Sequence, residues 1–306
     1  MLPPGIFLWE SGYEGLVSAS SAKSISSLSP IWGAELENYG PWDDVFHVDG
    51  LGRFVKSSTT CETTVVIVER CTSSMEAARL LVEVGALGPW GACLAVEQTN
   101  GRGQLRRPWD SPPGNLHTSV VLPSGPSHGE WGQVYRHLLP LLCGYILTEG
   151  IAELGVEIRL KWPNDLLQNN RKVGGMLIEE RNGVEILGFG LNLVAYPPDE
   201  KMREDRSVDA AVLQTKRAVT GALTLWETLV SRGKSMYVIL LGELEPFQFL
   251  SAITNRLAWL GERVSVREGG DDIYHAEVVG ISSGGGLVLR RAEGEVILFS
   301  GSIAPL

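Results

Sequence analysis

Short apolar runs in the middle of the chain predict strands. Residues 64–68, 92–96 and 117–122 are runs of this kind, and the first is almost entirely β-branched. Two longer runs, residues 171–180 and 184–193, follow closely on each other and carry glycines within them. We expect these two to form an antiparallel platform with a small molecule lying over it, because glycines inside a strand are costly unless a ligand or another backbone comes close.

Apolar residues at helical spacing predict helices in the second half of the chain. A long core-facing helix is expected over residues 131–154, and amphipathic helices over residues 223–241 and 244–259. The polar stretch before the last two helices contains prolines and is expected to be a loop with a short helical piece over residues 208–219.

The two ends of the chain have a different pattern. Residues 1–60 are rich in Ser, Gly and Pro, and are expected to form short strands and turns more than helices. After Gly261, about five short strand signals separated by glycine turns fit a small barrel. We therefore expect an N-terminal segment (residues 1–60), a central domain (61–257) and a C-terminal domain (258–306).

Composition and charge narrow the classes of function. The chain has 306 residues, of which 44% are hydrophobic and 20% charged, as is typical of globular proteins. Its formal charge of −10 argues against a general nucleic-acid binder. Residues 1–60 hold three basic and seven acidic side chains, which argues against a DNA-binding helix-turn-helix in this segment.

Cysteine usage and hydropathy suggest a compartment. The four cysteines are scattered, without a C-x-x-C pair or a histidine cluster beside them, so neither a disulfide framework nor a protein metal site is expected. The N-terminus lacks the basic and apolar regions of a signal peptide, and no apolar run approaches a membrane span. A soluble protein of the reducing cytoplasm is the expectation.

The loop over residues 97–109 has the composition of an anion-binding lid. Its glycines allow the backbone to approach a ligand closely, and its three arginines offer fixed forks of donors for phosphate or carboxylate. Trp109 adds a ring face on which a purine could stack. Taken alone, the same residues could equally be a solvated basic turn.

Two further stretches could supply partners for this loop. The strand signal over residues 156–162 stops at Pro163, which predicts that Asn164 and Asp165 stand at a strand end or bulge. They could form a surface turn or direct a carboxylate and an amide into a pocket. Lys172 comes just before a glycine pair, where a ligand could lie close to the backbone.

A helix start follows the first predicted strand. Ser73, with Glu76 three residues later, fits a capping box, so we expect a helix to begin there. The hydroxyls of Ser73 and Ser74 flank this helix N-terminus, which can donate to a polar ligand group. A plain helix cap is the default interpretation unless other residues converge on it.

Together these stretches resemble the signature blocks of one family. The blocks are Gly101-Arg102-Gly103 with Arg107 and Trp109, the Lys161–Asp165 and Lys172–Leu177 stretches, the helix start at Ser73-Ser74-Met75, and the Gly188–Leu193 strand. In this order and at this spacing they resemble the biotin protein ligase family, over roughly residues 64–306. The resemblance implies an α+β fold, with a mixed antiparallel sheet flanked by helices as in class II aminoacyl-tRNA synthetases, and a C-terminal SH3-like barrel.

The resemblance also implies a two-step reaction. Biotin and ATP, with Mg²⁺, give biotinyl-5′-AMP and pyrophosphate, and a lysine of a biotin carboxyl carrier domain then attacks the mixed anhydride. The first step brings a carboxylate and a phosphate together, so cationic groups that neutralise them are expected. No protein nucleophile is expected, nor any nucleic-acid or membrane partner, and a homodimer is left open.

Site residues follow from the resemblance position by position. The expected biotin-binding residues are Ser73, Ser74, Met75, Gln98, Arg102, Gly103, Gln104, Lys172 and Gly174. The expected ATP-binding residues are Arg102, Arg107, Trp109, Lys172 and Asn192. Lys172, Arg102 and Asp165 are the expected catalytic residues, with Asp165 placed to orient or deprotonate the acceptor lysine.

The chain departs from the family pattern at two positions and at one end. Gln104 stands where the family usually has a second loop arginine, and Met75 stands where it usually has asparagine. Glutamine cannot neutralise charge, so our hypothesis is that the adenylate escapes more readily here unless Arg106 compensates. Residues 1–60 match no part of the family that we can place, and their role stays open.

Other functions remain on the same fold. A lipoate-type ligase is one alternative, although its usual Arg-Arg-x-Ser-Gly-Gly-Gly block is absent, and an octanoyl transferase would need a pocket cysteine, whereas Cys93 falls in a strand predicted to be buried. A non-catalytic protein that binds biotin or an adenylate is another alternative.

Overall fold

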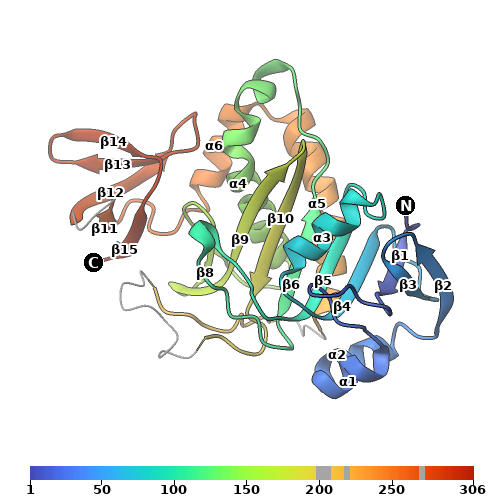
Figure 1. The fold of residues 1–306 in the computed structure, drawn as a ribbon. Helices are drawn as coiled ribbons and strands as arrows, with labels where there is room; N and C mark the ends of the chain where they lie inside the picture. Colours follow the sequence, from blue (N-terminus) through green and yellow to red (C-terminus); the bar gives the residue numbers. More distant parts are fainter. Residues whose placement is uncertain (198–207, 217–220, 269–272) are drawn as a thin grey trace.

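The computed structural model describes residues 1–197, 208–216, 221–268 and 273–306, except for the side chain of Arg106. Within these residues a ten-stranded sheet forms the centre of the molecule (Figure 1). The helices are α1 (Ala22–Leu28), α2 (Pro30–Glu37), α3 (Ser74–Glu83), α4 (Gly129–Ala152), α5 (Ala222–Glu243) and α6 (Pro246–Thr254), with a single 3-10 turn, η1 (Gln104–Arg106).

The central sheet is mixed, as expected. Its strands are β1 (Gly5–Leu8), β2 (Trp42–Val48), β3 (Gly52–Ser57), β4 (Thr64–Cys71), β5 (Ala92–Gln98), β6 (Leu116–Val121), β7 (Arg159–Lys161), β8 (Asp165–Gln168), β9 (Arg171–Arg181) and β10 (Val184–Leu191). Their order is β2-β3-β1-β4-β5-β6-β10-β9-β8-β7. The β1–β4 and β4–β5 pairs are parallel and the others antiparallel. The predicted antiparallel pairing of β9 and β10 is confirmed.

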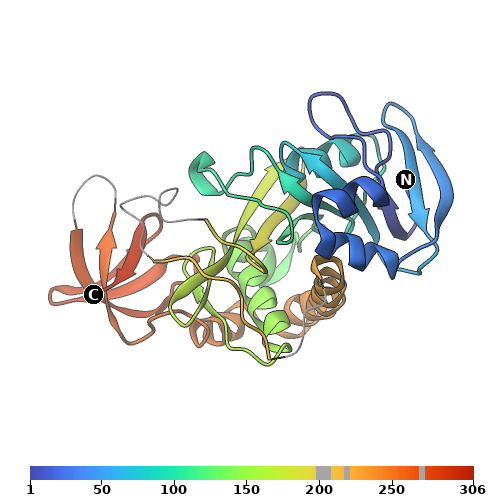
Figure 2. The ribbon, with the colours of Figure 1, turned by 90° about the horizontal axis from the view of Figure 1, so that it is seen from below.

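Alternation along the strands gives the sheet two different faces. On β10, Leu187 and Phe189 belong to the core formed with α4 and α5, whereas Gly188 and Gly190 face the opposite side. Figure 2 shows these two helices on one side of the sheet and the loop that contains η1 on the other. We call the side of Gly188 and Gly190 the front face; α3 covers part of it.

The first sixty residues are part of this sheet. Strand β1 pairs in parallel with β4, and β3 and β2 extend the sheet outward from it. The short strands expected in this segment are present, but it also contains two helices, α1 and α2, which the sequence did not indicate. The serines that suggested turns are helix caps: Ser21 and Ser29 accept hydrogen bonds from the backbone N–H groups of Ser24 and Trp32.

Glu35 of α2 ties this segment to the helical layer. Helix α5 has no side-chain cap of its own, and the buried carboxylate of Glu35 accepts hydrogen bonds from the N–H groups of Leu223 (3.0 Å) and Thr224 (2.6 Å) in its first turn. We expect Glu35→Ala to lower the free energy of unfolding by about 2 kcal/mol, because two backbone donors at the helix start, one of them buried, lose their acceptor. Urea denaturation measures this. Glu37→Ala, at an exposed position of the same helix, should change stability little.

Two secondary-structure predictions need correction. The strand expected over residues 156–162 is only the short β7, and β8 begins after a turn at Trp162–Asn164, so Asp165 stands at a strand end as expected. The helical piece expected over residues 208–219 is not found over residues 208–216, where Ala210 forms a bridge with Lys172, and its end lies outside the described residues.

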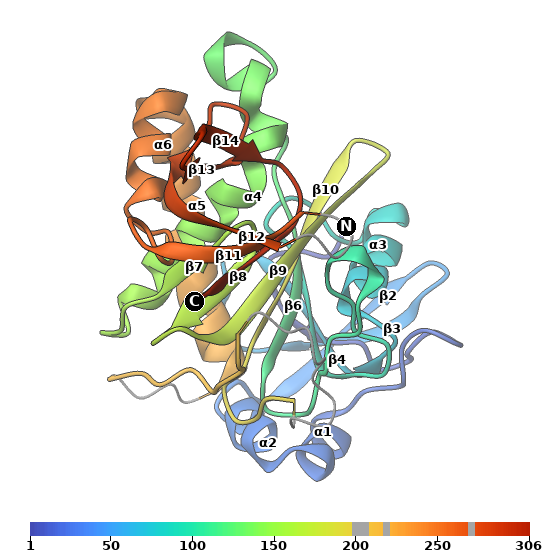
Figure 3. The same cartoon turned by 90° about the vertical axis from the view of Figure 1, so that its left-hand side faces the viewer.

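The C-terminal domain is a separate antiparallel sheet at the opposite end of the molecule from β2 (Figures 1 and 3). Its strands are β11 (Arg263–Arg267), β12 (Ile273–Ile281), β13 (Leu287–Arg291), β14 (Gly294–Leu298) and β15 (Ser302–Pro305), in the order β14-β13-β12-β11-β15. The sheet is SH3-like, but within the described residues its edge strands do not pair to close the barrel. The Trp162 indole N–H donates to the Gly285 carbonyl oxygen (2.9 Å) and so connects this domain to the turn before Asp165.

None of the helices in the described part of the chain has the length and apolar character needed to cross a membrane.

Candidate active site

A row of paired residues crosses the front face of the sheet. Asp165 of β8 lies beside Gly175 of β9, Gly175 beside Gly190 of β10, and Gly190 beside His117 of β6. Cross-strand partners share a face, so these four positions point the same way. Because the two in the middle have no side chain, the row forms an open floor between a carboxylate and an imidazole.

Trp109 lies on this floor. A Cβ at Gly190 would be 2.7 Å from the indole Nε1, and a Cβ at Gly175 would be 3.3 Å from the ring, so glycine is required for the ring to lie so close. The ammonium nitrogen of Lys172 is 5.2 Å from the ring centroid. The buried indole N–H has no hydrogen-bond partner among the described residues. The ring therefore packs directly on the floor, and its other face, with the Lys172 ammonium group nearby, could stack on a flat ligand.

Asp165 is held by two lysines. Its Oδ1 lies 2.6 Å from the Lys172 Nζ, and its Oδ2 lies 3.0 Å from the Lys161 Nζ. Burial alone would raise the pKa of this carboxyl, but the two ammonium groups, Lys172 foremost, outweigh it and lower the pKa to about 2. Asp165 is therefore an ionised orienting group and a poor proton acceptor near neutral pH.

A second polar cluster lies at the N-terminus of α3. The Gln98 Oε1 accepts a hydrogen bond from the Ser74 backbone N–H (2.7 Å), and its Nε2 donates to the Ser111 hydroxyl (2.7 Å). The hydroxyls of Ser74 and Ser119 share a hydrogen bond of 2.8 Å. These contacts fix the orientation of the Gln98 amide. Met75, on the same helix, lies close to Gly188, since a Cβ there would be 3.0 Å from the Met75 Cε.

The expected capping box at this helix is absent. Ser73 is the N-cap, as expected, but its hydroxyl accepts from the Met75 N–H (3.3 Å), and the Glu76 carboxylate is not turned back on the cap. Glu76 instead forms ion pairs with Arg102 and Arg79. Helix α3 therefore holds the base of the arginine loop.

The loop itself folds back as a narrow hairpin. Arg102 bridges to Pro108, and the Gly103 N–H donates to the Arg107 carbonyl oxygen (2.7 Å). This pairing returns Trp109 to the sheet, while Gln104 and Arg107 are exposed on the outer part of the loop. The structure thus brings Trp109 to the floor and Arg102 to α3, but leaves Gln104 and Arg107 exposed to solvent.

Asn192 continues the line of Gly188 and Gly190 beyond the end of β10. It is buried, and its side-chain amide donates to the Ala211 carbonyl oxygen (3.0 Å). The turn after it is organised by Asn115, whose Oδ1 accepts from three successive N–H groups, those of residues 193–195. Gly174 pairs with Leu191 at the same end of the sheet.

Sequence reasoning missed Asn115, Ser111 and Ser119. Ser119 carried a signal, because it is a polar residue inside an apolar strand, and such residues are buried only with a partner. Ser111 and Asn115 lie in the loop that precedes β6, where polar residues are common. Their hydrogen bonds can therefore be recognised only in the folded structure.

His117, at the end of the floor, makes stability depend on pH. Burial lowers its pKa to about 4, although its Nε2 contacts the Pro112 carbonyl oxygen. The ring is neutral in the folded protein, whereas the unfolded chain takes up a proton below about pH 6.5. The folded state should thus lose on the order of 3 kcal/mol of stability as pH falls from 6.5 to 4.

His117→Gln should remove this component of the acid sensitivity. Urea denaturation at several pH values measures it, with His47→Gln, at an exposed position, as the control. An unchanged pH dependence in His117→Gln would contradict the assignment.

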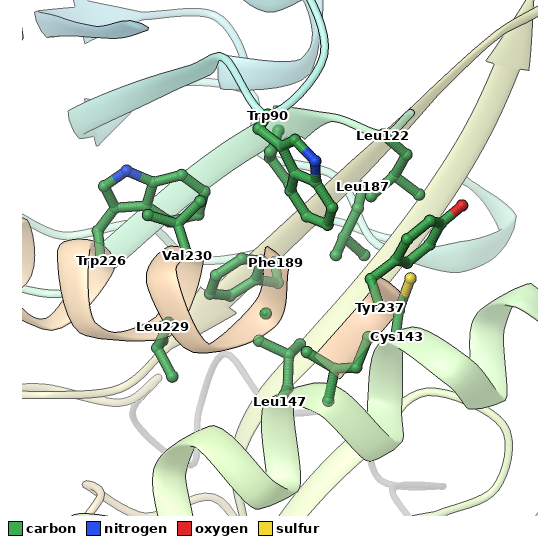
Figure 4. A pocket seen from close by; sticks show the side chains of 13 residues that line it. Trp90, Leu122, Cys143, Leu147, Leu187, Phe189, Trp226, Leu229, Val230 and Tyr237 are labelled. Carbon is green, nitrogen blue, oxygen red and sulfur yellow. The ribbon is translucent and has the colours of Figure 1, made fainter. Parts of the chain in front are cut away.

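A separate cavity of about 40 Å³ lies on the other face of the sheet, between α4, α5 and β10 (Figure 4). Its lining is almost wholly apolar and includes Trp90, Phe189, Trp226 and Tyr237. It offers no cationic donor to a nucleotide, so the front face is the candidate site. In the described chain no group of three or more His, Cys, Asp or Glu side chains could hold a metal ion.

The residues that form this candidate site fall within a region that matches a known protein family. The Biotin/lipoate A/B protein ligase family matches residues 68–193, which contain the glycine floor, Lys172 and the arginine loop. The Biotin protein ligase C terminal domain matches residues 259–304. The chain belongs to the biotin protein ligase family.

Relatives within the biotin protein ligase family differ in how much of each chain they share. The bifunctional ligase/repressor BirA of Escherichia coli is 33% identical over 132 residues, which are 40% of this chain and 39% of that protein. The match thus spans about two fifths of that relative's length. The biotin–acetyl-CoA-carboxylase ligase of Paracoccus denitrificans is 29% identical over 236 residues, 74% of this chain and 95% of that one.

Solved biotin protein ligases share the fold. The Aquifex aeolicus enzyme in complex with biotin and ATP has 24% identity and a TM-score of 0.62, covering 79% of this chain and 97% of that one. The Leishmania major enzyme in complex with biotinyl-5-AMP has 27% identity and a TM-score of 0.53, covering 78% and 100%.

Proposed function

We propose that this protein joins biotin and ATP to biotinyl-5′-AMP and pyrophosphate, and then transfers biotin to a lysine of a biotin carboxyl carrier domain. One observation carries the proposal: the Lys172 ammonium group, fixed by Asp165, lies at the edge of a glycine floor that is covered by Trp109. A related enzyme with biotinyl-5-AMP bound, which shares the fold, supports the choice of ligand.

In the first step the two reacting groups are both anions. The biotin carboxylate must approach the α-phosphate, and Lys172 and Arg102 are the cations on the front face that reduce their repulsion. The polar cluster of Ser73, Ser74 and Gln98 would hold the polar ring of biotin at the other end. The other residues that we propose to bind biotin are Gly103, Gln104, Met75 and Gly174. The other residues that we propose to bind ATP are Trp109, Asn192 and Arg107.

In the second step the amine nitrogen of the acceptor lysine attacks the acyl carbon of the anhydride. The ammonium group first loses a proton to solvent, the new C–N bond then forms as the C–O bond to AMP breaks, and AMP leaves with the electron pair while the nitrogen releases its second proton to solvent. Because its pKa is about 2, Asp165 would orient Lys172 and attract the incoming ammonium group, instead of serving as the base.

Among the described residues, no group of three His, Cys, Asp or Glu side chains could hold Mg²⁺. Both oxygens of Asp165 are engaged by lysines. Mg²⁺ is commonly held through substrate phosphates, and that is how it would enter with ATP.

A transfer assay tests the function. The protein is incubated with ATP, labelled biotin and an apo carrier domain, and in parallel with lipoate. Covalent label on the carrier lysine supports the ligase. Transfer of lipoate alone would support the related ligase, and tight biotin binding without turnover the non-catalytic binder. Analytical ultracentrifugation of the same sample, with and without biotin and ATP, tests the homodimer.

The hypothesis about Gln104 stays a prediction. The exposed position of this side chain leaves room for an arginine. We expect Gln104→Arg to slow the release of pre-formed, labelled biotinyl-AMP several-fold, since a charge-assisted hydrogen bond is roughly twice as strong as a neutral one. A rapid-dilution chase measures the release, and an unchanged rate counts against the hypothesis.

A further inference from the structure

Lys161 belongs to the Asp165 cluster, yet the proposed reaction gives it no role. It is the last residue of β7 and is only 6% exposed. Two backbone hydrogen bonds at its neighbour Leu160 hold the strand in place. The Leu160 N–H donates to the Arg256 carbonyl oxygen (2.8 Å), and the Leu160 carbonyl oxygen accepts from the Ala258 N–H (2.9 Å). A buried lysine on a fixed strand has little freedom to move.

The two lysines bind different oxygens of Asp165. A carboxylate held at one oxygen can turn about its terminal torsion, which is broad. A carboxylate held at both oxygens, at 2.6 and 3.0 Å, cannot turn without breaking a contact. Lys161 thus fixes the plane of the carboxylate whose other oxygen aims Lys172.

The two lysines also differ in exposure. The side chain of Lys172 is 29% exposed and that of Lys161 is 7% exposed. Lys172 is the one that can reach an anionic ligand over the floor. When it does so, Asp165 would be a buried charge without its stronger partner, which is costly unless another cation stays.

We propose that Lys161 is a positioning residue that keeps Asp165 ionised and oriented while Lys172 moves from Asp165 to the anionic ligand. This inference rests on the proposed adenylation reaction. Lys161 on β7 and Lys172 on β9 are the charged groups that the structure places against Asp165. Lys161 itself touches no reacting atom in this scheme.

The test compares Lys161→Met with Lys161→Arg in the full-length protein. Methionine keeps an apolar stem in the buried site, and Asp165 keeps its contact with Lys172 in the free protein. We expect the methionine variant to lower kcat of pyrophosphate release about tenfold or more, with little change in KM for biotin, and to shift the acid limb of its pH profile upward. The arginine variant should recover most of the rate.

Two readouts separate this role from a structural one. Thermal unfolding shows whether the variants are as stable as wild type, and a carbon-13 NMR titration of labelled Asp165 should show protonation at higher pH in Lys161→Met even without substrate. Lys234→Met, at a partly exposed ion pair with Glu62, is the control. If the methionine variant does not fold, Lys161→Gln replaces it.

The possible failures are distinguishable. Wild-type protein that releases no pyrophosphate from ATP and biotin overturns the proposed function, while the NMR titration still tests whether Lys161 holds Asp165 ionised. A stable Lys161→Met variant with wild-type kcat and an unshifted acid limb overturns the inference. So does a stable arginine variant as slow as the methionine one, because the charge would then not be what matters.

Discussion

Replacing Lys172 by methionine should lower the rate of biotinyl-adenylate formation by about two to three orders of magnitude, the usual effect of losing one preorganised group that stabilises developing charge. Lys172 is the ammonium group fixed by Asp165 at the edge of the floor. Without it the carboxylate of biotin and the α-phosphate would meet with one cation fewer. The effect should fall mainly on kcat, because the charge it neutralises grows in the transition state.

The fold should survive this substitution. Removing one partner of a buried ion pair is normally destabilising, but Asp165 keeps Lys161 at its other oxygen, 3.0 Å away. We therefore expect a loss of activity with a small change in melting temperature. Radiolabelled pyrophosphate exchange measures the first and calorimetry the second. Lys23→Met, at an exposed position of α1, is the matched control, and a Lys172→Met variant within tenfold of wild type would contradict the assignment.

The sequence predicted the glycines of the floor and the strands that carry them, but not how those strands align. Glycines inside strands are informative, because Gly175 and Gly190 weaken the sheet unless something must come close, and here Trp109 does. Local strand signals also predicted β4, β5, β6, β9 and β10. The pairing that aligns Asp165, Gly175 and Gly190 depends on register between strands far apart in the sequence, which no local pattern contains.

The capping box shows how a local rule fails near a candidate site. Ser73 and Glu76 have the right spacing, and Ser73 is indeed the N-cap. Glu76 pairs with Arg102 and Arg79 instead, because two guanidinium groups are stronger partners for a carboxylate than one backbone N–H. Tertiary charge decided the position of a side chain that local spacing had assigned to the helix.

The N-terminal segment was the least predictable part for a related reason. Its parallel β1–β4 pairing joins Gly5–Leu8 to Thr64–Ile67, across nearly sixty residues. Phe7 and Trp9 are fully buried there, so the segment contributes to the core of the sheet. We infer that it acts as a structural cover for the β4 edge, where unpaired backbone groups would otherwise be open to other chains.

Replacing Gly190 by valine should weaken biotin binding by about tenfold to a hundredfold. A Cβ alone at this position would lie 2.7 Å from the Nε1 and 2.8 Å from the Cε2 of Trp109, closer than side-chain atoms approach each other. The two methyl groups of valine would push the Trp109 ring off the floor and so disturb the site that we propose for the ligand. Overpacking of this kind costs about 1 to 3 kcal/mol, and each 1.4 kcal/mol is a factor of ten in affinity.

The strand itself should tolerate the change, since valine is favourable in strands and Gly190 has an extended backbone within β10. Calorimetric titration with biotin measures the affinity, and the change in tryptophan fluorescence reports whether Trp109 has left the floor. Gly280→Val on β12 is the control, because a Cβ there would meet its nearest neighbour at an ordinary 3.5 Å. If Gly190→Val binds biotin like wild type while Trp109 is displaced, the ligand does not lie on this floor and the proposed site is wrong.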